Sequence, residues 1–289
     1  MIVEIEATSG FCFGVERAVE AAEKALAGNN EVFCLGEIVH NPHEVQRLSN
    51  KGLKRIIHNT LPSLSGKTVM IRAHGEPPET YQTIRQSKNK LIDATCPVVL
   101  KLQKRVKKAW EENPNAQIVI YGKPGHPEVV SLSGQIGHKA IIVSDQHESL
   151  EKIDFRKSVV LFSQTTQSLE GFHGLVKELE CRLKNHHAGL SEALIVNDTI
   201  CRQVSRRGPA IKKFALSHDV VIFVSGANSS NGRYLFGLCL EANSNSYLIE
   251  QAGELRKDWF KGARSTGITG ATSTPRWQLE EIAQAIKNL

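Results

Sequence analysis

The sequence predicts an α/β fold built as a trefoil of three small modules, related by pseudo-threefold symmetry and formed mainly by parallel sheets. Two observations lead to this prediction. A short apolar strand that runs into a cysteine and then into a helix occurs three times along the chain. In addition, 289 residues with an apolar fraction of 40% exceed what one hydrophobic core usually holds, so several packed units fit the length.

The first copy begins with an apolar strand at residues 2–5, which leads to Cys12 and then to a helix. Gly28 is the expected end of that helix, because glycine tolerates the left-handed conformation that often terminates helices. Apolar residues recur at helical spacing on the inner face, at Val15, Ala18, Val19, Ala22 and Leu26.

The second copy repeats this order, with a strand at residues 91–95 that leads to Cys96. Pro97 suits the first position of the following helix, since its missing N–H is not needed there. The apolar stripe of this helix is expected at Val98, Leu102, Val106 and Trp110.

In the third copy a strand at residues 194–196 leads to Cys201. Proline starts a helix more readily than it sits inside one. Pro209 therefore predicts that the third helix begins late and holds Cys201 at a different angle.

Each helix is followed by a strand that ends in glycine. These strands, with their glycines, are 32–35 (Gly36), 118–121 (Gly122) and 221–224 (Gly226). Two further strands follow in each copy. The first is expected at 56–57, 141–143 and 247–249. The second is expected directly before a polar loop, and these loops are 73–75, 163–166 and 270–273. Short apolar strands separated by helices are typical of parallel sheets.

The module boundaries follow from the repeat. We expect a first module at 13–95, a second at 96–200 and a third at 201–289, completed by the N-terminal segment 1–12. The chain ends in a helix, roughly Pro275 to Leu289, without the strand that closes the other two copies. The N-terminal strand, Ile2 to Ala7, can fill that gap.

The cysteines indicate a metal centre. The start of the chain has no leader-like segment and no apolar run spans a bilayer, which predicts a cytoplasmic protein in which disulfides are disfavoured. A cysteine at a helix N-terminus is favoured as thiolate, the form that binds iron. Most iron-sulfur clusters take four cysteines, so a cluster held only by three converging thiolates, Cys12, Cys96 and Cys201, would leave one iron open to substrate. The other cysteines, Cys34, Cys181 and Cys239, are expected to be small buried hydrophobes.

The loops at the strand ends carry the remaining candidate residues. Ligands of open α/β sheets collect at the carboxyl ends of the strands. Histidine and hydroxyl donors there can bind phosphate oxygens, and a lone carboxylate can move protons. These residues are His40, His74, His126, Glu128, Thr165, Ser229, Ser230, Asn231 and Ser273.

Six loop motifs in collinear order resemble the LytB-type 4-hydroxy-3-methylbut-2-enyl diphosphate reductases of the non-mevalonate isoprenoid route. They are Val39-His40-Asn41, Ala73-His74-Gly75, Asp93 to Pro97, Gly125 to Glu128, Gln164-Thr165-Thr166 and Asn228 to Asn231. The match runs from Phe11 to Ser273.

The resemblance implies a trefoil around a central 4Fe-4S cluster held by Cys12, Cys96 and Cys201, with the substrate hydroxyl on the open iron. It implies an oxidoreductase that removes this hydroxyl as water and releases isopentenyl and dimethylallyl diphosphate. The diphosphate would contact His40, His74, Ser229, Ser230, Asn231 and Ser273, with His126 beside it. Glu128, helped by Thr165 and His126, would deliver the proton, and an external ferredoxin or flavodoxin would supply two electrons.

Two departures from the family pattern stand out. Val204 takes the place of an expected threonine, and Gly208-Pro209 follows Arg207 where the family has an Arg-Gln pair. The last loop reads Gly270-Ala271, with glycine and alanine exchanged relative to the usual order. Ser273 still falls in register with Pro275.

Three alternatives stay open at the level of sequence. Quinolinate synthase and the diphthamide-forming enzymes also resemble threefold proteins with one cluster cysteine per module, although they lack these loops. An iron-sulfur sensor that binds nucleic acid would need a clustered basic face with aromatic platforms. The basic residues look dispersed and aromatic residues are 6% of the chain, so no nucleic acid is expected. A catalytically degenerate relative is the third alternative, because of Val204 and Gly208-Pro209.

Overall fold

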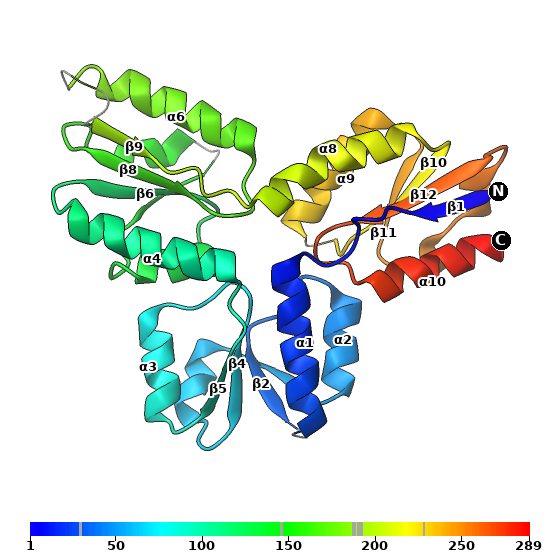
Figure 1. Cartoon of the computed structure of the whole chain (residues 1–289), viewed down its shortest axis with the longest axis horizontal. Coiled ribbons are helices and arrows are strands. Elements are labelled where there is room, and N and C mark those ends of the chain that lie inside the picture. Colours follow the sequence, from blue (N-terminus) through cyan, green and yellow to red (C-terminus); the bar gives the residue numbers. More distant parts are fainter. Residues whose placement is uncertain (29–30, 145–146, 187–188, 190–192, 228) are drawn as a thin grey trace. The chain divides into compact units, whose positions relative to one another are not determined.

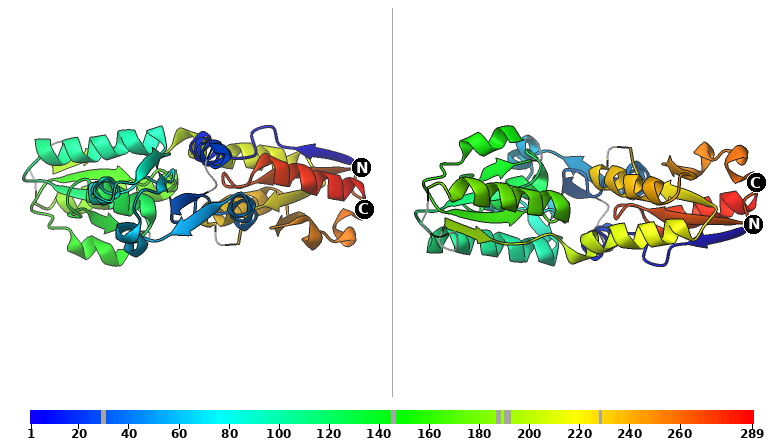
Figure 2. Two further views of the ribbon diagram at one scale, coloured as in Figure 1. Left: turned by 90° about the horizontal axis from the view of Figure 1, so that it is seen from below. Right: turned by 90° about the horizontal axis from the view of Figure 1, so that it is seen from above.

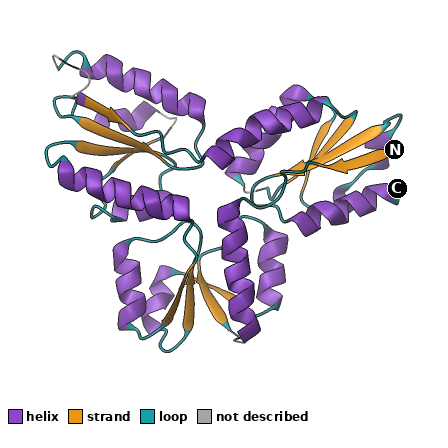
Figure 3. Cartoon of the chain, in the orientation of Figure 1, coloured by secondary structure: helices purple, strands orange, loops and turns teal. Residues whose placement is uncertain are grey.

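Three four-stranded sheets form the framework of the protein (Figures 1 and 3). The computed structural model describes residues 1–28, 31–144, 147–186, 189, 193–227 and 229–289. Every strand pair with a described register is parallel, as the sequence predicted. Two compact units are distinguished, one of residues 1–32, 37–54 and 206–289, the other of residues 33–36 and 55–205. The three module boundaries predicted from the repeat stay a prediction.

The three sheets share one strand order. The strands of the first are β2 (Val32–Leu35), β3 (Leu53–Ile56), β4 (Thr68–Ile71) and β5 (Lys90–Asp93). Those of the second are β6 (Gln117–Tyr121), β7 (Ile141–Val143), β8 (Val159–Ser163) and β9 (Leu194–Val196). The third has β10 (Val220–Val224), β11 (Ser246–Ile249), β12 (Ser265–Gly270) and β1 (Ile2–Ile5). The orders are β3-β2-β4-β5, β7-β6-β8-β9 and β11-β10-β12-β1, so each sheet places its strands in the same relative sequence.

The N-terminal strand completes the last sheet. β1 pairs with β12 in parallel, with Ile2 opposite Ser265 and Ile5 opposite Ile268. This confirms that the N-terminal strand fills the position that the C-terminal segment leaves open. The chain ends in α10 (Arg276–Lys287), which buries Leu279 and Ile282 in the core of that sheet.

Helices occupy the connections between strands. The longer ones are α1 (Phe13–Gly28), α4 (Pro97–Glu112), α6 (Leu169–Leu183), α8 (Arg202–Leu216) and α9 (Ser230–Ala242). The shorter ones are α2 (Pro42–Asn50), α3 (Pro78–Gln86) and α5 (Pro127–Gly134). Four 3-10 segments lie at His58–Ser63, His147–Lys152, Ala252–Glu254 and Lys257–Phe260. Within the described residues no helix combines the length and the apolar character that a membrane span requires.

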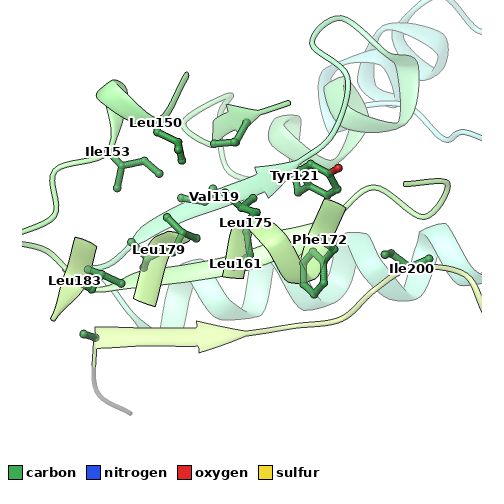
Figure 4. Close-up of a cluster of buried hydrophobic side chains, with 13 residues drawn as sticks. Val119, Tyr121, Leu150, Ile153, Leu161, Phe172, Leu175, Leu179, Leu183 and Ile200 are labelled. Carbon is green, nitrogen blue, oxygen red and sulfur yellow. The ribbon is translucent and has the colours of Figure 1, made fainter. Parts of the chain in front are cut away.

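The sheet of β6 to β9 shows how alternation of side chains builds two cores. Ile118 and Ile120 point to the face covered by α4 and α5, while Val119 and Tyr121 point to the face covered by α6. Figure 4 shows the second core, in which Phe172 of α6 lies near Tyr121. Figure 1 shows α4 and α6 on opposite sides of this sheet, and Figure 2 gives two further views of the same elements. The carboxyl ends of its strands are thereby held between two packed layers.

Two predictions about side-chain burial were wrong. Val98 on α4 is 39% exposed and Val99 is buried in its place, because the apolar face of the helix is centred on Val99, Leu102 and Val106. Cys181 is exposed on α6, whereas Cys34 and Cys239 are buried as expected. The phase of a helix face shifts by 100° per residue, so a one-residue error in a short stripe changes which side chain is buried.

The third helix does not begin late. α8 starts at Arg202, directly after Cys201, and continues through Pro209. The preceding residue, Gly208, has no Cβ to clash with the proline ring, which relieves the steric conflict that usually keeps such a residue out of the helical region. Pro209 removes one helical hydrogen-bond donor but does not end the helix.

A buried ion pair fixes the first turns of α8 within its unit. Both terminal nitrogens of Arg207 bond the Glu6 carboxylate, at 2.8 and 2.9 Å. Arg207 also donates to the Thr8 hydroxyl (2.8 Å), the Thr269 hydroxyl (3.2 Å) and the Gly270 carbonyl (3.1 Å). One guanidinium therefore ties α8 to the end of β12 and to the segment that leads from β1 to Cys12.

Removing this guanidinium should destabilise the protein strongly. Arg207→Leu leaves the Glu6 carboxylate buried without its partner, and loss of one member of a buried pair costs about 3–5 kcal/mol. Urea unfolding, followed by circular dichroism, measures the change in the free energy of unfolding. Arg206→Leu, on the exposed neighbour, is the control and should stay within about 0.5 kcal/mol of wild type. Equal effects of the two substitutions would contradict the assigned role of the ion pair.

Candidate functional site

The three predicted ligand cysteines occupy equivalent places in their sheets. In each case the backbone N–H of the cysteine donates to the carbonyl of the second residue after the end of a neighbouring strand. The bonds are Cys12 N to Thr272 O (3.1 Å), Cys96 N to Ala73 O (3.0 Å) and Cys201 N to Thr165 O (2.8 Å). The acceptors follow β12, β4 and β8, which hold the same position in the shared strand order. The threefold repeat predicted from the sequence therefore includes this backbone hydrogen bond in all three copies.

Each of these cysteines also begins a helix. The carbonyls of Cys12, Cys96 and Cys201 accept the amide hydrogen of the residue four positions on, at 2.9 Å in all three cases. A side chain at this position lies beside amide groups that have no helical acceptor. The arrangement matches the site that favours an anionic sulfur.

At Cys96, burial opposes the stabilisation of the thiolate by the helix N-terminus. Desolvation raises the pKa of the Cys96 thiol, and the backbone N–H groups of Val98 and Val99 only partly offset it. Negative charge on Cys201 and on Glu128 raises this pKa further, which shows that the three groups are electrostatic neighbours. The helix terminus favours the thiolate of Cys96, as predicted for this position, but desolvation is the larger effect here.

The remaining cysteines differ from this pattern. Burial raises the pKa of Cys34 to about 12, so its thiolate is strongly disfavoured. Cys239 is buried and donates to the Ser246 hydroxyl at 3.4 Å. Cys181 lies on the exposed side of α6. None of the three stands at the N-terminus of a helix.

Glu128 and Thr165 form a buried pair in the unit that holds Cys96 and Cys201. Thr165 donates its backbone N–H to Glu128 Oε1 (2.7 Å) and its hydroxyl to Oε2 (2.8 Å). Glu128 is 2% exposed. Burial raises the pKa of Glu128, and the two bonds from Thr165 lower it by a smaller amount. Since the Thr165 carbonyl also accepts from Cys201, one residue connects the carboxylate to a candidate ligand.

His126 caps the helix that carries Glu128. Its Nδ1 accepts the backbone N–H of Glu128 at 3.2 Å. In the neutral ring this assigns the proton to Nε2, which can donate to a bound anion. His74 lies with its ring edge-on to His126, at a centroid separation of 5.2 Å. The two predicted histidines of this unit are therefore neighbours.

The other unit holds Cys12, His40, Ser229, Asn231 and Ser273. Gly226 lies against the backbone of His40, because a Cβ built on Gly226 would stand 3.1 Å from the His40 carbonyl oxygen. Any side chain at this position would press the loop after β10 away from the histidine. The close approach of these two segments explains the glycine.

The hydroxyl and amide groups of this unit are held by local bonds. Ser229 caps α9 by accepting the Gly232 N–H at 3.0 Å, which leaves its hydroxyl hydrogen to donate elsewhere. Asn231 donates to the Thr272 hydroxyl at 3.1 Å, next to Ser273. The Ser273 hydroxyl oxygen is buried and has no hydrogen-bond partner among the described residues. The Ser230 side chain and Asn228 lie outside the described residues.

Two polar residues near the site were not predicted as site residues. Gln164 accepts the Lys123 N–H at 3.1 Å and donates to the Thr166 hydroxyl at 2.8 Å, which connects the loops after β6 and β8. Thr272 holds Asn231 through its hydroxyl and Cys12 through its carbonyl. The sequence did contain a signal for Thr272. It stands two residues after the end of its strand, as Thr165 does in the preceding copy.

The chain is similar to known reductases over its whole length. Residues 3–287 match the family described as LytB protein. The 4-hydroxy-3-methylbut-2-enyl diphosphate reductase of Parabacteroides distasonis is 47% identical over 99% of this chain and 98% of its own length. The enzyme of the same name from Bacteroides fragilis is 48% identical, covering 99% of this chain and 97% of its own.

Solved structures give the same result. A structure described as (E)-4-hydroxy-3-methyl-but-2-enyl diphosphate reductase, the terminal enzyme of the non-mevalonate pathway, superposes with a TM-score of 0.75 at 35% identity and full coverage of both chains. The E-1-hydroxy-2-methyl-but-2-enyl-4-diphosphate reductase of Plasmodium falciparum superposes with a TM-score of 0.82 at 26% identity, covering 99% of this chain and 88% of that one. The family resemblance read from the loop motifs is confirmed.

Loss of the Thr165 hydroxyl should raise the pKa of Glu128 further. Thr165→Val keeps the shape of the side chain but removes a hydrogen bond that favours the carboxylate form. Carbon-13 NMR of protein labelled at the glutamate carboxyl groups measures this titration. The neighbouring Thr166→Val substitution is the control, because Thr166 is exposed and its hydroxyl bonds Gln164 instead. An unchanged or lowered pKa of Glu128 in Thr165→Val would contradict the assignment.

Proposed function

The chain belongs to the LytB protein family, and from that premise we propose that it removes the hydroxyl group of 4-hydroxy-3-methylbut-2-enyl diphosphate by reduction. The products are isopentenyl and dimethylallyl diphosphate. The reaction uses two electrons and two protons and releases the hydroxyl oxygen as water. The observation that supports this most directly is the equivalent placement of three cysteines, one of which adjoins the buried Glu128–Thr165 pair.

We propose that Cys12, Cys96 and Cys201 hold one 4Fe-4S cluster. The donor set fits, because all three side chains are thiols at helix N-termini, and thiolate is the usual protein ligand of iron-sulfur clusters. With three protein ligands the cluster would supply electrons and an open Lewis-acid position for the substrate. Such a cluster needs a reducing compartment, which supports a cytoplasmic location.

The diphosphate is assigned to the histidine, hydroxyl and amide groups of the strand-end loops. Burying its charge is costly unless donors surround it. The capping bonds favour this role, because they use the Nδ1 of His126 and the hydroxyl oxygen of Ser229 as acceptors, so each side chain meets an anion as a donor. The buried Ser273 hydroxyl adds a further donor. The remaining members of this group are His40, His74, Ser230, Asn231 and Thr165.

Glu128 is assigned as the proton donor to the departing hydroxyl. A carboxyl group whose pKa is raised by burial holds its proton to higher pH and can release it during the reaction. Thr165 positions the carboxyl group through two hydrogen bonds, and His126 sits at the start of the same helix. A ferredoxin or flavodoxin is the proposed electron donor, and no nucleic acid takes part.

The function can be tested with anaerobically reconstituted protein. Turnover of 4-hydroxy-3-methylbut-2-enyl diphosphate with dithionite and a viologen dye as reductant is expected to give both products. Mössbauer spectra with and without this diphosphate should change at one iron site only. Absence of turnover by protein that holds its full complement of iron would overturn the proposal and favour a degenerate relative.

The cysteine assignment predicts a difference between two serine variants. Cys12→Ser should lose most of its iron after reconstitution, because a hydroxyl is a poor substitute for thiolate. Cys34→Ser should retain iron, since Cys34 is buried against Arg72 and Glu76 away from any helix N-terminus. Iron and sulfide content per chain give the result. Equal iron content of the two variants would contradict the assignment of Cys12.

Glu128→Gln should slow turnover without destabilising the fold. Turnover is expected to fall about 10²- to 10⁴-fold, the usual effect of losing a general acid. Burial raises the pKa of Glu128 on folding, so its contribution to stability is complete below the unfolded pKa and is lost as the pH rises through the folded pKa. At pH 8 the variant should therefore be at least as stable as wild type in urea. Glu111→Gln, on the exposed side of α4, is the control for both measurements.

A further inference from the structure

The outer face of α4 is strongly basic. Residues 97–108 contain five lysine or arginine residues and no aspartate or glutamate. In the sequence these residues look dispersed, but helical spacing gathers four of them within about 100° of the helix circumference. This stripe, called the α4 stripe below, consists of Lys101, Lys104, Arg105 and Lys108, all exposed.

The stripe faces away from the sheet because the opposite side of the helix is fixed in the core. Leu102 and Val106 are buried against Ile118 and Ile120 of β6. The helix cannot rotate without exposing these side chains to water. The positive charges are therefore held in one direction.

The stripe lies close to two of the candidate cluster ligands. Cys96 begins α4, and Lys101 follows it by five residues, a rise of about 7.5 Å along the helix axis. Arg105 donates to Asn197 Oδ1 at 2.7 Å, which places the segment leading to Cys201 beside the stripe. The basic face thus adjoins the chain on the approach to both cysteines.

Local stabilisation does not account for these charges. Lys108 pairs with Glu112 at 3.5 Å, but no acidic side chain within the described part of the chain pairs with Lys101 or Lys104. Cations in the first half of a helix gain nothing from the helix dipole, which favours them at the carboxyl end. Their common direction fits recognition of a negatively charged partner.

We propose that the α4 stripe is the docking surface for an acidic protein that carries one electron at a time on a flavin or an iron-sulfur centre. This inference rests on the proposed function, because the reduction consumes two electrons that the substrate does not contain. Two reduced carriers would dock in turn, each giving one electron, and with two protons these convert the C–OH group into C–H and water. Complementary charge would act mainly on the rate of encounter.

Charge reversal on the stripe tests the proposal. Lys101→Glu/Lys104→Glu/Lys108→Glu is compared with Lys157→Glu/Lys177→Glu/Lys184→Glu, which changes the net charge equally at exposed sites outside α4. With reduced acidic bacterial flavodoxin as donor, the stripe variant should lose about tenfold or more in kcat/KM for flavodoxin at low ionic strength. The loss should shrink as salt is added. With dithionite and a viologen dye, both variants should match wild type.

The possible outcomes are distinct. The docking proposal would be overturned if the two triple variants had equal rates with flavodoxin. It would also be overturned if the stripe variant lost as much activity with dithionite as with flavodoxin. Failure of the wild type with dithionite would instead overturn the proposed function. The affinity of flavodoxin for each variant, measured by fluorescence titration, separates the two cases, because a docking defect weakens binding whether or not turnover occurs.

Discussion

The site is organised by one backbone hydrogen bond that occurs three times, from a cysteine amide to a carbonyl just beyond a strand end. A buried amide must find an acceptor, so this bond fixes where the chain leaves one strand relative to its neighbour. Each of the three cysteines also supplies the carbonyl that starts a helix. The thiol is held by both constraints, and neither involves the sulfur atom. The backbone of each cysteine is therefore fixed by bonds that do not use its side chain.

The common strand order explains how the other residues are distributed. In the sheets of β2 to β5 and β6 to β9 the chain leaves the second and third strands toward opposite edges, and ligands of open α/β sheets commonly bind at the carboxyl ends of such strands. His126 and Glu128 follow β6, Thr165 follows β8, and Ser229 and Asn231 follow β10. The cysteines follow the fourth strand of each sheet instead. The candidate binding groups and the candidate ligands thus follow different strands of each sheet.

Much of this plan could be predicted from sequence because it depends on local and repeated signals. The parallel strands, the helix starts at Cys12 and Cys96 and the closing role of β1 all follow from apolar runs at a fixed spacing. The helix through Pro209 was missed because the consequence of Gly208 for its neighbour is steric and has no periodic signature. The bonds of Arg207 to Glu6 join residues 201 positions apart, so sequence spacing could not reveal them. The phase of the α4 face was misjudged by one residue, at Val98, since that stripe is short.

The parallel pairing of β1 with β12 has a consequence for how the protein is made. Residues 2–5 are synthesised about 260 residues before the strand that they pair with, at 265–270. The hydrogen bond from the Cys12 amide to the Thr272 carbonyl likewise forms only after Thr272 has been synthesised. Whereas most domains begin to fold from their N-terminal end during translation, this unit can close only once residues 265–270 have emerged. Glu4 within β1 and Glu6 directly after it place negative charges on this segment, and such charges disfavour pairing with foreign sheet edges during that interval.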